Sequence, residues 1–373
     1  MAAAGMAPGD PRSLDAFLLR MPKVELHVHL EGSIRPSTLL ALARRHGVGL
    51  PAADEAGLRE WFRFRDFEHF VEIYLTVSRC LRAAEDFHRL TLDFLAEQAR
   101  QSVLYTEAHF TVATHAANGV DAEAVAAALD EAAAEGRRRF GVEVRWIPDV
   151  VRNVGPEAAD VTLAWALAHR RHGVVALGLS GSEDRFPNEP FAEHFAEAER
   201  QGLHRVAHAG EHAGPASIRS SLAVARAERI GHGVRAVEDP ELVAELARRR
   251  VPLEVCPTSN VCLGVHRSLA EHPFDALRRA GVPVSVNSDD PPFFDTTLTG
   301  EYTALARTFG YDAADLAGLS LAAVDQAFLP DAERRALAAR MERDFAALGE
   351  ELLGAPVEAR REVVAEAAVA GRG

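Results

Sequence analysis

The stretch VELHVH, residues 24–29, opens a series of eight short runs in which β-branched and apolar residues predominate. The other seven runs are VLYTEAHF (103–110), VEVRWI (142–147), VVALGL (174–179), HRVAHA (204–209), RIGHG (229–233), VPLEVC (251–256) and VPVSVN (282–287). Longer stretches rich in Ala, Leu, Glu and Arg separate them, an alternation that indicates parallel strands joined by crossover helices. Eight such units predict an α/β fold of the (β/α)8 TIM-type barrel class.

The connection between the first two predicted strands is unusually long, because a helix with two turns needs only about half of its length. We therefore expect a helical insertion after the first strand, over residues 33–100. Its aromatic residues either form the core of a small helical subdomain or act as a lid that faces a ligand at the strand ends.

The other boundaries follow from the pattern along the chain. Residues 1–20 are expected to form a flexible tail, and residues 21–350 a single barrel domain that includes the insertion. Extra helices are expected after residue 310, and residues 351–373 are expected to form a C-terminal helical tail.

Composition narrows the class of partner. The formal net charge of −14 argues against broad binding to nucleic acid or to an anionic membrane, so a small molecule is the expected partner. Three scattered cysteines favour reduced thiols over a disulfide framework. With no signal peptide and no long apolar run, the sequence predicts a soluble, cytoplasmic protein, and it leaves the oligomeric state open.

Reactive side chains gather where the predicted strands end, which is the catalytic end of barrels of this kind. They are His27, His29, His208, His232, Asp289 and Asp290. A single histidine of this set is more often a satisfied polar residue than a ligand, but six polar groups at one rim indicate a site.

Imidazoles and a carboxylate suit a borderline metal such as Zn²⁺, which lowers the pKa of bound water from 15.7 to about 7. Glu211, in the run HAGE, stands close enough along the chain to reach a substrate or that water. The pattern therefore predicts a metal-dependent hydrolase.

Two alternative metal chemistries lack residues that they need. A two-metal centre bridged by a carboxylated lysine is excluded, because Lys23 is the only lysine and it stands at the opposite end of the predicted barrel. HLE at residues 29–31 fits half of the zinc signature of His/Cys/Cys nucleobase deaminases, but the second half, P-C-x-x-C, is missing. One metal ion is therefore expected.

Five ordered motifs carry a family resemblance: PKVELHVHLEGSIRP, HAGEHAGP, ERIGHGV, CPTSN and NSDDPP. Together they resemble the adenosine deaminase family of the amidohydrolase superfamily, whose members hydrolyse the 6-amino group of adenine-type purines. The resemblance implies one Zn²⁺ per chain and gives each motif residue a role. The implied zinc ligands are His27, His29, His208 and Asp289.

The same resemblance implies the residues that act on the purine. Glu211 would protonate N1, and His232 would orient the attacking hydroxide. Asp290 would hydrogen-bond N7, and the backbone N–H of Gly181 would contact N3.

Glu31 departs from the family pattern. Members that act on adenosine commonly have aspartate there, in contact with a ribose hydroxyl, whereas this chain reads HLEG. The longer side chain is compatible with three substrates: adenosine or an adenosine-like nucleoside as the first expectation, and adenine or aminodeoxyfutalosine as alternatives. A barrel that only binds a partner is disfavoured, because the complete set of ligands and the acid are all present.

Overall fold

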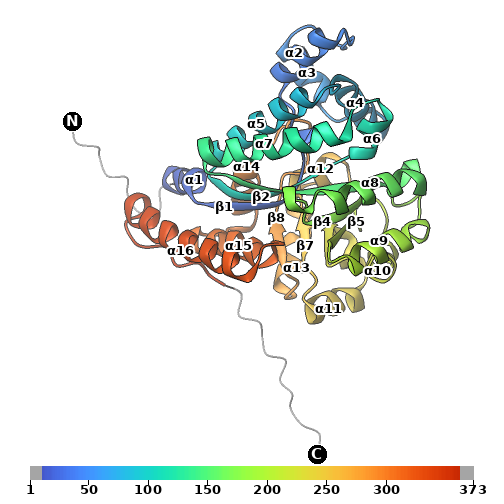
Figure 1. The fold of residues 1–373 in the computed structure, drawn as a ribbon. Coiled ribbons are helices and arrows are strands. Elements are labelled where there is room, and N and C mark those ends of the chain that lie inside the picture. The colour runs from blue at the N-terminus through green and yellow to red at the C-terminus, as the bar shows by residue number, and fades with distance from the viewer. Residues whose placement is uncertain (1–10, 362–373) are drawn as a thin grey trace, which may run out of the picture.

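The computed structural model describes residues 11–361 and shows a barrel of eight parallel strands with helices around it (Figure 1). Its strands are β1 (Lys23–His29), β2 (Val103–Phe110), β3 (Glu143–Val151), β4 (Ala176–Ser180), β5 (His204–Ala209), β6 (Arg229–His232), β7 (Leu253–Val255) and β8 (Val284–Val286). Each strand pairs with the next along the chain, and a parallel bridge between Val28 and Asp289 brings the end of the series back to β1. The predicted fold class is confirmed.

Helices connect the strands and cover the barrel from outside (Figure 1). Those that follow β2 to β7 are α6 (Val112–Ala117), α7 (Ala122–Phe140), α8 (Pro156–Ala168), α9 (Ala192–Arg200), α10 (Pro215–Ala223), α11 (Pro240–Arg249), α12 (Pro257–Cys262) and α13 (Phe274–Arg279). Four of them begin at a proline, which suits the first helical turn because its N–H needs no partner there. No helix within residues 11–361 is long and apolar enough to cross a membrane.

Four helices fill the predicted insertion between β1 and β2: α2 (Pro36–His46), α3 (Glu55–Phe62), α4 (Phe67–Cys80) and α5 (Ala84–Arg100). Helices α2 to α4 lie together at the top of Figure 1, whereas α5 packs on β2 and α7. Aromatic rings join the insertion to the loop after β8: the ring centroids of Phe62 and Phe293 are 4.8 Å apart, and those of Phe70 and Phe294 are 5.9 Å apart. The insertion therefore holds the loop that carries Asp289.

The predicted tails are partly wrong. Residues 11–20 form helix α1 (Pro11–Arg20), in which Phe17 and Leu18 are fully buried, so this segment belongs to the packed structure. At the other end, α14 (Leu298–Phe309), α15 (Ala313–Gln326) and α16 (Asp331–Leu353) are the extra helices, but residues 354–361 are not helical. Residues 1–10 and 362–373 of the predicted tails lie outside the described residues.

A buried cluster of charged side chains joins three of the strands. Arg229 on β6 donates to Glu107 of β2 at 2.6 Å and lies 2.5 Å from a carboxylate oxygen of Glu254 on β7. All three side chains are at most 1 % exposed, so each carboxylate needs the cation beside it. The guanidinium also stacks on the ring of Phe328, 3.7 Å from its centroid.

Lys23 closes the end of the barrel at which β1 begins. Its Nζ donates to the carbonyl oxygens of Leu18, Met21 and Gln101, so all three ammonium hydrogens have acceptors. The side chain is fully buried, and burial lowers the pKa of Lys23 to about 7. This contact ties α1 and the segment before β2 to the first strand.

Candidate active site

Four of the predicted side chains converge where the strands end. His27 and His29 come from β1, His208 from β5 and Asp289 from the loop after β8; their ligand atoms all lie within 4.8 Å of one another. His29 Nε2 is 3.2 Å from His208 Nε2, and Asp289 Oδ1 is 3.5 Å from His27 Nε2 and 3.4 Å from His29 Nε2. All four residues are buried.

The donor atoms of this cluster fit a borderline metal such as Zn²⁺. Three imidazole nitrogens and one carboxylate oxygen are ligands that zinc prefers. In addition, His27 Nε2 is buried without a hydrogen-bond partner among residues 11–361, which is costly unless a ligand engages it. The cluster is therefore a candidate metal site.

The closure of the barrel puts Asp289 beside the two β1 histidines. The Asp289 N–H donates to the carbonyl of His27 at 3.2 Å, and the His29 N–H donates to the carbonyl of Asp289 at 2.9 Å. Asp289 has φ 65° and His232 has φ 62°, in the left-handed region that costs a non-glycine residue about 1–3 kcal/mol. Such a conformation persists only where the surrounding structure holds the backbone in place. Both residues are predicted site residues, so the structure holds the backbone at the site.

Glu254 fixes the orientation of the His27 ring. Glu254 Oε2 is 2.8 Å from His27 Nδ1, and its other oxygen pairs with Arg229. Burial alone would raise the pKa of Glu254, but Arg229 and His27 outweigh it and lower the pKa to about 2. The carboxylate therefore accepts a hydrogen from Nδ1, which leaves the Nε2 lone pair facing the candidate metal position.

The other two histidines of the cluster also have an oxygen beside Nδ1, which is within hydrogen-bond distance only in His208. His208 Nδ1 lies 3.1 Å from the carbonyl oxygen of Leu179. His29 Nδ1 lies 3.8 Å from Asp149 Oδ2, and the second oxygen of Asp149 is 2.9 Å from His109 Nδ1. All three rings of the cluster thus direct Nε2 inward.

Glu254→Gln is expected to weaken Zn²⁺ binding about 10–100-fold, because an amide holds the His27 ring and its tautomer less firmly than a carboxylate. The measurement is the Zn²⁺ Kd from competition with a chromogenic chelator. Glu241→Gln, at an exposed position of α11, is the matched control. Equal Kd values for the two variants would contradict the orienting role of Glu254.

Glu211 follows β5 in a turn that a second buried carboxylate holds. Glu183 accepts the N–H groups of Gly210, Glu211 and His212 at 2.7, 3.0 and 3.0 Å. Gly210 has φ 67°, and a Cβ there would lie 2.4 Å from Ile218 Cδ1, so the turn requires glycine. The sequence analysis missed Glu183, although it stands in the SGSE run after β4.

The Glu211 carboxylate faces two histidines. Its Oε2 is 3.1 Å from His212 Nδ1 and 3.6 Å from His232 Nε2. Burial raises the pKa of Glu211, but His232 and His212 outweigh burial, and the pKa lies below its ordinary value. The side chain is therefore ionised before a ligand binds and is able to accept a proton.

Glu31 is held by residues that follow β2. Its Oε1 accepts hydrogen bonds from Thr111 N and Thr111 Oγ1 and also lies beside His115 Nε2. Each of these three distances is 2.8 Å. Burial raises the pKa of Glu31, but His115 and the Thr111 N–H outweigh it and lower the pKa to about 2. Oε2 is buried with no partner among the described residues. Only this second oxygen can receive a ligand.

Asp290 and Gly181 are at the same rim. Asp290 packs so closely on Gly32 that a Cβ on this glycine would lie 1.6 Å from Asp290 Oδ1. Burial, and then the neighbouring charge of Asp289, raise the pKa of Asp290 well above its ordinary value. Gly181 has φ 94°, and a Cβ there would lie 2.3 Å from Asn153 Oδ1.

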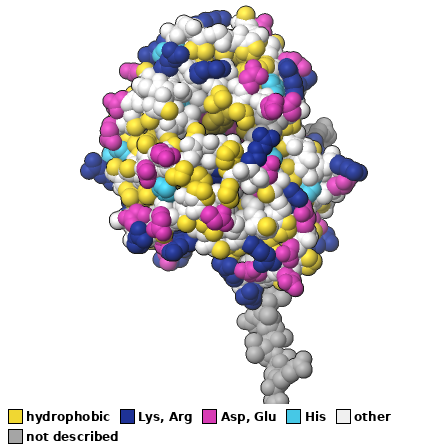
Figure 2. All heavy atoms as spheres, turned by 90° about the vertical axis from the view of Figure 1, so that its right-hand side faces the viewer, with side chains coloured by type: hydrophobic (Ala, Val, Ile, Leu, Met, Phe, Trp, Pro, Cys, Tyr) yellow, Lys and Arg dark blue, Asp and Glu magenta, His cyan; other side chains and the backbone are white. Residues whose placement is uncertain are grey.

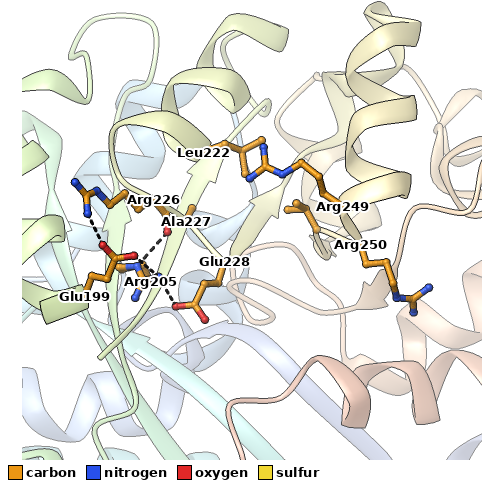
Figure 3. A pocket seen from close by; sticks show the side chains of 9 residues that line it. Glu199, Arg205, Leu222, Arg226, Ala227, Glu228, Arg249 and Arg250 are labelled. Carbon is orange, nitrogen blue, oxygen red and sulfur yellow. Dashed lines mark hydrogen bonds and ion pairs between the residues drawn. The ribbon is translucent and has the colours of Figure 1, made fainter. Parts of the chain in front are cut away.

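A surface cavity of about 380 Å³ opens at the other end of the barrel, near the first residues of β5, β6 and β7 (Figure 3). Its lining is charged, but ion pairs such as Arg205–Glu228, at 2.9 Å, and Arg226–Glu199 neutralise much of it. None of the predicted site residues lines this cavity. On the face drawn in Figure 2, basic and acidic side chains are interspersed around a central group of hydrophobic ones.

Comparison with known proteins agrees with the site. The sequence model of the family described as adenosine deaminase matches residues 22–344. An aminodeoxyfutalosine deaminase of Streptomyces coelicolor is 42% identical over 324 residues, which cover 86% of this chain and 84% of the relative. An adenine deaminase of Cupriavidus metallidurans is 39% identical over 328 residues, which cover 88% of this chain and 92% of the relative.

A solved structure with bound zinc has the same fold. An amidohydrolase of Burkholderia ambifaria with bound Zn superposes with a TM-score of 0.85 at 26% identity, covering 93% of this chain and 98% of that one. Fold, site and relatives together define a metal-dependent hydrolytic deaminase that acts on adenine-like substrates. The chain belongs to the adenosine deaminase family of the amidohydrolase superfamily.

Proposed function

We propose that the protein catalyses the zinc-dependent hydrolytic deamination of the 6-amino group of adenosine or an adenosine-like purine nucleoside. Ammonia and the 6-oxo, inosine-type nucleoside would be the products. The observation that carries the proposal is the convergence of His27, His29, His208 and Asp289 beside the carboxylate of Glu211. One zinc ion per chain is proposed, held by the first four residues.

Zinc at this position would lower the pKa of a bound water to about 7 and so supply hydroxide near neutral pH. Glu211 accepts the proton that the attacking water loses, because its side chain is ionised beforehand. It then delivers this proton to N1 of the purine, which makes C6 more electrophilic. After the oxygen adds to C6, its remaining hydrogen would pass to the 6-amino group, the C6–N bond would break, and ammonia would leave as the C6=O bond forms. His232 faces the same space and would orient the attacking oxygen.

Two further groups would align the ring. N7 of adenine is a hydrogen-bond acceptor, so it needs a donor, and a raised pKa keeps a hydrogen on the carboxyl group of Asp290. The backbone N–H of Gly181 would donate to N3. Both contacts lie on the base, so they would serve every 6-aminopurine alike.

Glu31 would select among 6-aminopurines. Its Oε1 is saturated by Thr111 and His115, and its Oε2 is an ionised acceptor without a protein donor among residues 11–361. Such an oxygen requires a donor from the ligand, and a sugar hydroxyl supplies one. The similarity to a relative named aminodeoxyfutalosine deaminase is a reason to test this modified nucleoside first.

Adenine is the second candidate substrate. The relative from Cupriavidus metallidurans is named an adenine deaminase, at 39% identity. The free base also offers a donor, its N9–H, to the Glu31 carboxylate. The two candidates therefore differ in what fills the space beside Glu31.

A panel assay of the zinc-loaded protein tests these proposals. The substrates are aminodeoxyfutalosine, adenosine, 2′-deoxyadenosine and adenine, and the signal is the loss of 6-aminopurine absorbance. We expect turnover of at least one nucleoside. Glu31→Asp should lower kcat/KM for it about 10- to 100-fold, because the shorter side chain loses its charged hydrogen bonds. Turnover of adenine alone would overturn the nucleoside proposal.

The site also bears on partners and location. A small 6-aminopurine is the proposed partner, and binding to nucleic acid or to a membrane is not proposed. A cytoplasmic location is proposed as well, since all three cysteines are free thiols and Cys80 and Cys256 are buried.

A further inference from the structure

A chain of buried polar groups leads away from His232. His232 Nδ1 lies 3.1 Å from Asn260 Nδ2, and Asn260 Oδ1 lies 3.2 Å from His272 Nε2. The chain ends at the backbone of Phe274, whose N–H donates to His272 Nδ1 at 3.2 Å. None of these four residues is more than 3 % exposed, so every polar atom of the chain depends on its protein partner.

The direction of each hydrogen bond in this series of buried groups follows from the last bond, between Phe274 and His272. A backbone N–H can only donate, so Nδ1 of His272 is an acceptor and a neutral His272 carries its hydrogen on Nε2. That hydrogen needs an acceptor, which is the Asn260 carbonyl oxygen. The amide nitrogen of Asn260 then faces His232 and donates to its Nδ1. His232 must therefore hold its own hydrogen on Nε2.

Two observations support this assignment. Burial lowers the pKa of His272 to about 3, so this ring is neutral at physiological pH. The Asn260 side chain is also firmly placed, because the N–H groups of Val265 and His266 both donate to its carbonyl and its own N–H donates to Cys256. A rotated amide would place its NH2 group against the Nε2–H of His272, a donor against a donor.

Three histidines at the rim thus divide into two kinds according to which atom is hydrogen-bonded to Nδ1. An acceptor faces Nδ1 in His27 and His208, which leaves the Nε2 lone pair inward. A donor faces Nδ1 in His232, so an N–H points inward instead. Nε2 of His232 cannot then ligate a metal, although its ring belongs to a second group of close ligand atoms with Cys256.

We propose that Asn260 and His272 are positioning residues that fix the tautomer of His232, so that its Nε2–H is presented to the reacting groups beside Glu211. The inference rests on the proposed function, since it is there that His232 acts on the attacking oxygen. The Nε2 atom is 3.6 Å from Glu211 Oε2, so a hydrogen on it faces the space in which Glu211 would act. The opposite tautomer would present a lone pair to the same atoms.

Asn260→Asp is the sharpest test, because it keeps the shape and the acceptor for His272 but places a second acceptor against His232. Nδ1 of His232 is then expected to gain a hydrogen. We expect kcat to fall about 10²-fold or more, in line with the loss of about 10⁴-fold when a catalytic histidine holds the wrong tautomer. KM is expected to change by less than kcat, and zinc content to stay at the wild-type level.

The tautomer is read from the ¹⁵N chemical shifts of His232 in the full zinc-loaded chain with labelled histidine. Wild-type protein should show a protonated Nε2 and an unprotonated Nδ1. His272→Gln, which retains a donor for Asn260, should keep this signature, and His272→Leu should lose it together with kcat. His88→Leu, at a half-buried position on α5, controls for the loss of a histidine.

The outcomes separate this inference from the proposed function. A wild-type His232 with its hydrogen on Nδ1, or an Asn260→Asp protein with unchanged tautomer and kcat, overturns the inference even if deamination is confirmed. Absence of deamination in every substrate assay overturns the proposed function, while the ¹⁵N shifts still decide the tautomer. His272→Gln keeps a polar side chain of similar size. If the other variants fold poorly, the ¹⁵N shifts of the wild type and of this variant still test the tautomer.

Discussion

Glu211→Gln should lower kcat by about 10³-fold or more, because general acid–base groups typically contribute about 10²- to 10⁴-fold and this one serves twice. The amide cannot accept the proton that the attacking water loses and cannot pass one to N1 of the purine. Its shape is nearly unchanged, and Glu183 still holds the backbone of the turn. The measurement is steady-state kinetics on the best substrate of the panel, with metal content by atomic emission.

Zinc content is the internal control for this variant, since Glu211 is not among the proposed ligands. A Glu238→Gln protein, with the change at the exposed carboxylate that pairs with Arg235, should behave as wild type. Retained turnover in Glu211→Gln would remove Glu211 from the proton-transfer role. Loss of zinc together with turnover would show that the carboxylate supports the metal site instead.

His208→Ala should abolish both metal binding and turnover. The variant loses one of three inward nitrogens, and the remaining groups, His27, His29 and Asp289, offer only three ligand atoms. Wild-type protein is expected to hold about one zinc ion per chain, and this variant close to none after dialysis. Inductively coupled plasma emission gives the stoichiometry directly.

Removal of the metal from wild-type protein gives a second measurement of the same dependence. Treatment with a chelator should abolish turnover, and stoichiometric Zn²⁺ should restore it. His194→Ala, on the outer helix α9, is the matched histidine control. Full metal content in His208→Ala would contradict the proposed ligand set, and activity of the chelated wild type would contradict a metal-dependent reaction.

The order of the strands and the convergence of the rim residues were predictable from the sequence, because a parallel barrel brings the ends of its strands to one rim whatever the loops contain. His27 and Asp289 are therefore correctly placed by their positions at strand ends. Their orientation was not predictable. The carboxylate that turns the His27 ring stands 227 residues further along the chain, in a strand with no sequence motif.

Helix α1 and the support of His232 show the same limit. Residues 11–20 have no strand pattern, and their burial depends on α16, where Glu351 pairs with Arg20 across 331 positions of sequence. CPTSN was recognised as a motif, but the function of Asn260 within it depends on His272, which stands outside the motif. A local sequence pattern identifies which reactive side chains lie at the site. The tautomer of His232 and the burial of helix α1 depend on contacts between residues that are far apart in the sequence.

Lys23 gives the barrel a chemical reporter. It is the only lysine of the sequence, and its amine is enclosed by the carbonyl groups of Leu18, Met21 and Gln101. An acylating reagent therefore meets no exposed side-chain amine on the folded chain. Acylation of residue 23, read by mass spectrometry over time, measures how often the first strand and α1 separate. It needs no introduced residue, and it reports on the end of the barrel remote from the chemistry.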